Sequence, residues 1–99
     1  MAIISKLPGS EKVKEQEKKA LDRLNQIYRD KKEKDGLNQT KLAELMGIKQ
    51  QSAISQYLLG KIPLNVISVL NFAQALEVSP LEIYPELMQP VYDLFQTKN

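Results

Sequence analysis

The chain has 99 residues, a formal net charge of +2, and neither cysteine nor histidine. This length suits one small domain, and without these residue types the chain has no disulfide, no thiolate or imidazole metal ligand and no histidine general base, so we expect no enzyme activity, no cofactor and no metal site. Because no apolar run approaches the ~18 residues of a membrane span and the start lacks a signal-peptide pattern, we expect a cytoplasmic protein with no membrane partner.

The N-terminal residues 1–10 show no hydrophobic period and contain Pro8-Gly9, which is a strong loop signal. We therefore expect a flexible N-terminal arm over residues 1–10. From Ser10 to Lys34 the chain predicts one long helix, because apolar residues recur at intervals of three and four. Asp35-Gly36 would end this helix, and its inner face would consist of Ala20, Leu21, Leu24, Ile27 and Tyr28.

The stretch from Asn38 to Gly60 predicts two short helices joined by a tight turn. The first helix would span about Gln39–Met46, and Gly47 follows at the position where a helix often ends in a residue with positive φ. Ile48 would then pack into the turn. The inner face of this first helix would consist of Leu42, Ala43, Leu45 and Met46.

The second helix of the pair would be capped by Ser52 and would run to about Leu59, with an inner face of Ile54, Tyr57 and Leu58. The opposite face is polar rather than charged, and it consists of Gln50 at the entrance, Gln51, Ser52, Ser55 and Gln56. Glutamine can bond adenine at N6 and N7 together, and serine can bond a base edge or a phosphate. This face therefore favours contact with DNA, although a polar helix start without a ligand would have the same composition.

A fourth helix is predicted over Leu64–Glu77, with Pro63 in its first turn. Its apolar residues lie nearly all round the helix, so we expect it to be buried beneath the others. These residues are Val66, Ile67, Val69, Leu70, Phe72, Ala73 and Leu76. Val78-Ser79-Pro80 marks a break, after which a short turn would pack on the core through Leu81, Ile83 and Tyr84.

The C-terminal part predicts a helix from about Pro90 to Gln96, because Pro90 should interrupt any helix that passes through it. An apolar stripe on this helix would consist of Val91, Leu94 and Phe95, with Leu87 and Met88 at its margin. The stripe would either close the core of the monomer or pair with a second copy of the chain. We thus divide the chain into an arm over residues 1–10, a core over residues 11–84 and a C-terminal helical part over residues 85–99.

Charge is unevenly distributed along the chain. Residues 1–61 hold 13 Lys and Arg against 8 Asp and Glu, a balance of +5, whereas residues 62–99 hold 1 against 4, a balance of −3. The basic residues cluster near the end of the first predicted helix, just before the polar helix pair. A basic first part suits a phosphate backbone, and an acidic last part suits a protein partner.

Together these features resemble the helix-turn-helix of the Cro and lambda-type phage repressor family over roughly Glu15 to Gln96. The most specific elements are Ile27-Tyr28 before a lysine run, Gln39 with Ala43 and Gly47, Gln51-Ser52, Gly60, Asn65 and Val91-Tyr92. Between Gly47 and Ile54 this chain has one residue more than the family pattern. Gln50 and Gln51 therefore compete for the position of the family's base-contacting glutamine, and we favour Gln51 because Ser52 follows it directly.

The resemblance implies an all-α fold of five helices and a transcriptional repressor that binds an operator on double-stranded DNA. Bases would be contacted by Gln50, Gln51, Ser52, Ser55 and Gln56, and the DNA backbone by Tyr28, Lys31, Lys32, Gln39, Lys49, Lys61 and Asn65. A homodimer would bind a palindromic operator, with an interface of Leu87, Met88, Val91, Leu94 and Phe95. Two alternatives stay open on the same fold, an antitoxin subunit and a protein-interaction domain that does not bind DNA.

Overall fold

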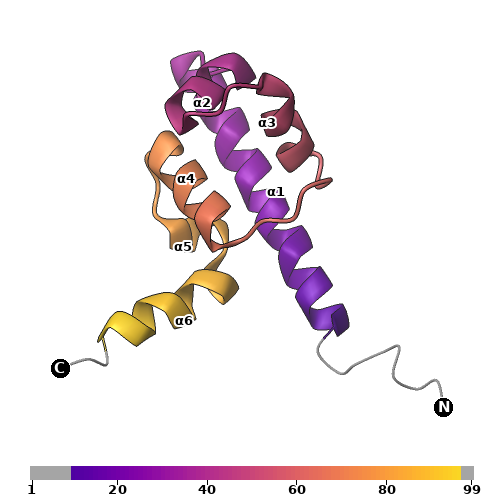
Figure 1. The fold of residues 1–99 in the computed structure, drawn as a ribbon, viewed down its shortest axis with the longest axis vertical. Helices are drawn as coiled ribbons and strands as arrows, with labels where there is room; N and C mark the ends of the chain where they lie inside the picture. Colours follow the sequence, from indigo (N-terminus) through magenta and orange to yellow (C-terminus); the bar gives the residue numbers. More distant parts are fainter. Residues whose placement is uncertain (1–9, 97–99) are drawn as a thin grey trace.

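The computed structural model describes residues 10–96, with side chains from Val13 onward, and these residues form helices, turns and loops without a strand. The helices in this range are α1 Ser10–Asp35, α2 Gln39–Met46, α3 Gln51–Leu58, α4 Val66–Leu76, α5 Pro80–Ile83 and α6 Pro85–Gln96 (Figure 1). The all-α fold with a helix-turn-helix as its second and third helices is confirmed. The described part has six helices instead of five because the turn expected after Pro80 is one turn of helix, α5.

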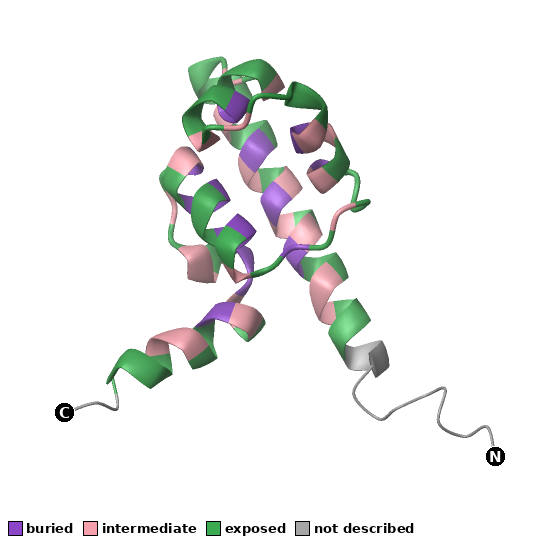
Figure 2. Ribbon diagram, viewed as in Figure 1, coloured by how far each residue is buried: buried purple, intermediate pink, exposed green. Residues whose placement is uncertain are grey.

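The arm predicted for residues 1–10 lies outside the described residues, except that Ser10 begins α1. The long helix α1 is the axis of the fold, and α3, α4 and α5 pack against it. Its buried face consists of Ala20, Leu24 and Tyr28, which are spaced four residues apart. Figure 2 shows the buried positions turned inward along α1 while its N-terminal turns extend beyond the other helices. Three residues of the predicted inner face are therefore confirmed as buried, and the other two, Leu21 and Ile27, are half-buried beside them.

The turn between α2 and α3 has the predicted geometry. Gly47 has a φ of +72°, and the amide of Ile48 donates to the carbonyl of Ala43 at 2.8 Å, which satisfies the end of α2. Leu42 and Ala43 are buried at the crossing with α3. Leu45, however, is 54% exposed, so its predicted burial is wrong. At 100° per residue, Leu45 lies about 110° round the helix from the middle of the face that Leu42 and Ala43 define, and it lines surface hollows between α2 and α4 instead of packing in the core.

The start of α3 also differs from the prediction. The helix begins at Gln51, and its N-cap is Gln50, which makes no capping hydrogen bond through its side chain. Ser52 is already the second residue of the helix and is exposed, so it does not cap α3. The inner face of α3 is as predicted, because Ile54 and Leu58 are buried and the ring of Tyr57 packs edge-on against Phe72, with 5.4 Å between ring centroids.

Helix α4 is two-sided rather than buried all round. It begins at Val66, two residues later than predicted, so Pro63 lies in the preceding loop. Because α1, α2 and α5 cover only one side of it, Ile67 is 65% exposed and Leu70 is 39% exposed. The buried side carries Val69, Phe72, Ala73 and Leu76.

The C-terminal helix α6 continues through Pro90, where we expected a break. Its first turn is anchored, because the amides of Leu87 and Met88 both donate to the carbonyl of Tyr84, at 3.2 and 3.0 Å, and Met88 is fully buried. Pro90 is exposed and removes only the bond that its amide would make to the carbonyl of Glu86. Packing of the first turn thus outweighs the absence of one hydrogen bond.

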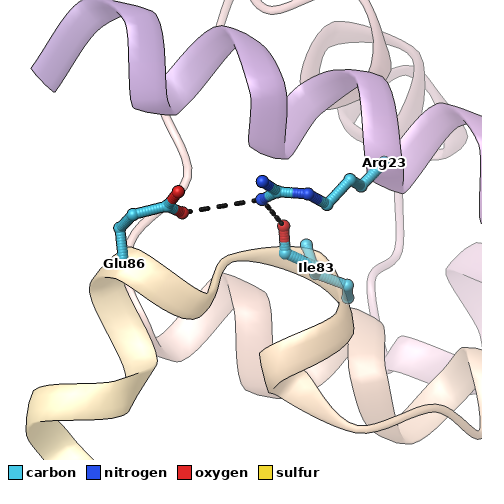
Figure 3. A network of polar contacts seen from close by, with 3 residues as sticks. All are labelled: Arg23, Ile83 and Glu86. Atoms are coloured by element: carbon cyan, nitrogen blue, oxygen red, sulfur yellow. Dashed lines mark hydrogen bonds and ion pairs between the residues drawn. The ribbon is translucent and has the colours of Figure 1, made fainter. Parts of the chain in front are cut away.

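A polar contact fixes where α6 leaves the body of the protein. The guanidinium of Arg23 on α1 donates from Nη1 to the carbonyl of Ile83 at 3.1 Å, and the same nitrogen lies 3.5 Å from Oε1 of Glu86 (Figure 3). From this junction α6 points away from the other helices and contacts mainly α5. The end of α6 is therefore a projecting arm of the fold.

Candidate nucleic-acid interface

The outer face of α3 carries the polar side chains that the sequence singled out. Gln51, Ser52 and Gln56 are exposed, and Ser55 is half-buried. Ser52 and Gln56 lie on the side of α3 opposite the buried Ile54, and Gln51 and Ser55 lie between that side and the packed side. This polar row has donors and acceptors but no charge, and amide and hydroxyl side chains of this kind can hydrogen-bond base edges in the major groove.

Gln50 and Gln51 occupy different structural positions. Gln50 has the extended backbone of an N-cap (φ −108°, ψ +117°), and its exposed side chain has no capping role. Gln51 is the first helical residue, and its Oε1 accepts a hydrogen bond from Oγ1 of Thr40 on α2 at 2.7 Å. Thr40 was not among the residues predicted to lie at this site. A separation of eleven residues carries no local signal, and only the crossing of α2 and α3 brings the two side chains together.

The far end of α3 is held by a second contact that sequence reasoning missed. Nδ2 of Asn25 donates to the carbonyl of Leu21 at 3.0 Å on its own helix and to the carbonyl of Leu58 at 2.9 Å on α3. Both amide hydrogens are therefore used, and one of the unpaired carbonyls at the end of α3 is satisfied. Gly60 lies next to this contact with a φ of +81°, and a Cβ there would lie 2.8 Å from the Cδ2 of Leu21. The chain thus passes over α1 at a position where glycine fits.

Residues around the start of α2 form the first candidate contact with the DNA backbone. Asn38 caps α2 by accepting a hydrogen bond from the amide of Lys41 at 2.8 Å. Lys31, Asn38 and Lys41 line a surface hollow of about 450 Å³, which also carries the acidic side chains of Asp35 and Glu77. The structure therefore brings the predicted Lys31 to the entrance of α2 beside a lysine that was not among the predicted contacts. Of the other candidates here, Lys32 is exposed and Gln39 is half-buried.

The second group of candidate backbone contacts surrounds α3. Lys49 is exposed in the turn before the helix, and Lys61 is exposed just after it. The amide of Lys61 donates to the carbonyl of Gln56 at 2.9 Å, so the backbone of this lysine is fixed against the end of α3. The structure thus places one lysine at each end of the polar row.

Asn65 caps α4 in a reciprocal arrangement with Ser68. Oδ1 of Asn65 accepts from the amide of Ser68 at 2.8 Å, and Oγ of Ser68 accepts from the amide of Asn65 at 2.8 Å. These bonds use the carbonyl oxygen of the Asn65 side chain and orient its exposed amide group. The donor needed for a phosphate contact is therefore held in one direction.

Tyr28 has a ring that packs in the core and a hydroxyl that reaches the protein surface. The residue is 8% exposed, and burial raises the pKa of its hydroxyl above the ordinary value. The hydroxyl is therefore neutral at physiological pH and can donate a hydrogen bond. Among the described residues no fully buried side-chain nitrogen or oxygen lacks a partner, which agrees with a Tyr28 hydroxyl that reaches the surface.

The C-terminal apolar stripe divides between the core and the surface. Met88 is fully buried in the monomer, so its predicted position at the margin of an exposed interface does not hold. Leu87 and Val91 are half-buried and pack against the core, whereas Leu94 and Phe95 are 71% and 74% exposed. The part of the predicted interface that is exposed in the monomer is thus the end of α6.

Residues 10–96 contain no group of three or more acidic residues arranged to hold a metal ion. Over the same range, no helix combines the length and the apolar character that crossing a membrane requires. The candidate site in this range remains the polar face of α3 with its basic surroundings.

A known family model matches the part of the chain that forms this candidate interface. A family model described as helix-turn-helix matches residues 29–83, which run from the last turns of α1 through the end of α5. The matched span thus covers more than half of the chain and contains α2, α3 and the loop that carries Lys61. A comparison with curated proteins gave no match.

Proposed function

Because the chain belongs to the helix-turn-helix family of lambda- and Cro-type repressors, a family of DNA-binding transcription regulators, we propose that it represses transcription by occupying an operator on double-stranded DNA as a dimer. In this proposal the outer face of α3 enters the major groove. Gln51, Ser52 and Gln56 contact bases, with Gln50 and Ser55 at the edges of the row. The surrounding lysines and Asn65 bond phosphates and set the position of α3.

The observation that carries the proposal is the exposed, uncharged row of side chains on α3 with a lysine at each end. A helix face that serves only solubility usually carries Glu and Lys, which form helix well and are favourably hydrated. An amide and hydroxyl row instead provides directional donors and acceptors for base edges. Lys49 and Lys61 add the positive charge that a phosphate backbone attracts.

The operator can be found by selection of binding sites from random duplexes, and Gln51 can then be tested on it. We expect Gln51→Ala to weaken binding to the selected operator by about 1–3 kcal/mol and to leave nonspecific binding nearly unchanged. Gln74→Ala is the matched control, because Gln74 is exposed on α4 away from the row. An equal loss on random and selected DNA would show that Gln51 contacts the backbone, and a failure to enrich any sequence would refute specific recognition.

Pairing through the end of α6 is the second part of the proposal. Burying an exposed leucine or phenylalanine yields about 1.5–3 kcal/mol before the costs of association, so two such residues per chain support only a weak dimer. DNA with two half-sites, about 34 Å apart, would then favour the dimer by mass action. We expect a concentration-dependent monomer–dimer equilibrium and cooperative binding to a palindrome.

The dimer can be tested with two substitutions at exposed positions, which avoid the residues that pack in the core. Leu94 and Phe95 are exposed, so Leu94→Ser with Phe95→Ser should remove pairing without unfolding the monomer. Ile67→Ser is the matched control, because Ile67 is 65% exposed on α4. Analytical ultracentrifugation and titration with a palindrome measure both effects. Unchanged cooperativity in the double variant would place the interface elsewhere.

A further inference from the structure

The hydrogen bond between Thr40 and Gln51 joins the side chains of two helices at the proposed interface. Oγ1 of Thr40 donates to Oε1 of Gln51 over 2.7 Å, and both residues are exposed. Other hydrogen bonds between side chains in the described part, such as that from Gln26 to Asp30, lie within one helix. This short bond joins two exposed side chains across the crossing of α2 and α3, and neither helix needs it to complete its own backbone hydrogen bonds.

This bond fixes which end of the Gln51 amide faces outward. A hydroxyl that donates its single hydrogen can do so only to the carbonyl oxygen of an amide, so Oε1 is turned toward α2. The Nε2 group, with two hydrogens, is then turned away from α2. In the major groove that group can donate to N7 of adenine, to O6 or N7 of guanine, or to O4 of thymine, and the second lone pair of Oε1 stays available for N6 of adenine.

Holding the amide before binding also lowers the cost of recognition. A glutamine side chain loses much rotamer freedom when it is fixed against a base, and a bond that already restricts it leaves less to lose. When the interface closes and water leaves, a hydrogen bond between the two side chains becomes stronger. Gln50 is not restricted in this way at the start of α3, because its side chain makes no capping hydrogen bond.

We propose that Thr40 is a positioning residue, which orients Gln51 for base recognition without itself contacting the base. The inference rests on the proposed function, because it concerns the same DNA-contacting face. It also selects Gln51 over Gln50 as the main base-contacting glutamine. Between Gly47 and Ile54 the chain has one residue more than the family pattern. In the structure Gln51, which lies in this segment, forms its hydrogen bond with Thr40, the second residue of α2.

The test uses two substitutions at Thr40 that differ in the hydroxyl. Thr40→Val keeps the shape and removes the donor, whereas Thr40→Ser keeps the donor. On the operator selected by the parent protein, we expect Thr40→Val to lower affinity about five- to tenfold and Thr40→Ser to lower it less than about twofold. Binding to random duplex should be the same for all three proteins, and circular dichroism should show the same helical content and melting, because Thr40 is exposed.

A double-mutant cycle decides whether Thr40 acts through Gln51. If Thr40 positions Gln51, Thr40→Val should cause no more than about a twofold further loss in a Gln51→Ala background. A second selection with Thr40→Val should also show weaker preference at the base pair that Gln51 contacts. The inference is overturned if Thr40→Val leaves operator affinity unchanged, or if its loss is equally large without Gln51. Absence of any sequence preference in the parent protein would instead refute the proposed function, and the inference with it.

Discussion

Asn65 offers a way to separate a structural role from a DNA contact at one position. Its side-chain Oδ1 accepts from the amide of Ser68, and its backbone amide donates to Oγ of Ser68, each at 2.8 Å, while the residue itself is exposed. Asn65→Asp retains the oxygen that accepts from the amide of Ser68, and a negative charge at a helix start is favourable. Asn65→Ala removes that oxygen and should lower the free energy of unfolding by about 1 kcal/mol.

On DNA the two variants should behave in the reverse order. Asn65→Asp loses the donor and places a carboxylate beside a phosphate, so we expect a loss of about 1.5–3 kcal/mol in binding, the value of a hydrogen bond to a charged group. Asn65→Ala loses the donor without adding the repulsion and should bind more tightly than Asn65→Asp. Denaturant unfolding measures the stabilities, and fluorescence anisotropy with the selected operator measures the affinities. Normal DNA binding by Asn65→Asp would show that Asn65 is only a cap, and unchanged stability of Asn65→Ala would refute the capping argument.

Three further predictions concern charge, packing and pH. Lys31→Ala combined with Lys32→Ala should flatten the slope of log affinity against log salt by about 1.8, or 0.9 for each phosphate that the protein no longer neutralises, and an unchanged slope would mean that both lysines are only solvated. Asn25→Asp should lower the free energy of unfolding by about 1–3 kcal/mol in denaturant titrations, because a carboxylate would face two carbonyl oxygens, and a change below about 0.5 kcal/mol would contradict this. Burial raises the pKa of the Tyr84 hydroxyl above its ordinary value of 10.0, so the stability that this group contributes is complete below about pH 10 and is lost as the pH rises further; Tyr84→Phe should reduce that alkaline loss, as measured by unfolding at several pH values.

The sequence predicted the elements whose signals are local. Gly47 marked the end of α2 because a positive φ favours glycine, and the spacing of Ile54 and Leu58 marked the inner face of α3. It did not predict which sides of the helices the fold leaves uncovered. Leu45 and Ile67 are apolar and exposed, since burial depends on how many neighbours pack on a helix and not on its own pattern.

Pairings between distant residues were equally beyond the sequence. The contact of Thr40 with Gln51 and that of Asn25 with Leu58 depend on the crossing of helices, which no local pattern encodes. The helix through Pro90 was missed for a related reason. The rule that proline interrupts a helix considers only local structure, whereas the burial of Met88, which anchors the first turn of α6, is a tertiary interaction.

The projection of α6 has a mechanical consequence. A helix of 12 residues is about 18 Å long, so each degree of tilt at its base displaces its far end by about 0.3 Å. The exposed Leu94 and Phe95 lie at that far end, and Arg23 holds the base through Ile83 and Glu86. In the proposed dimer, a pairing surface at this far end could follow small differences in the separation of the two DNA-bound domains while each α3 stays in the major groove. In that arrangement the stiffness of the whole junction, formed by Arg23, buried Met88 and the hydrogen bonds to the carbonyl of Tyr84, would set how strictly the protein measures the distance between its half-sites.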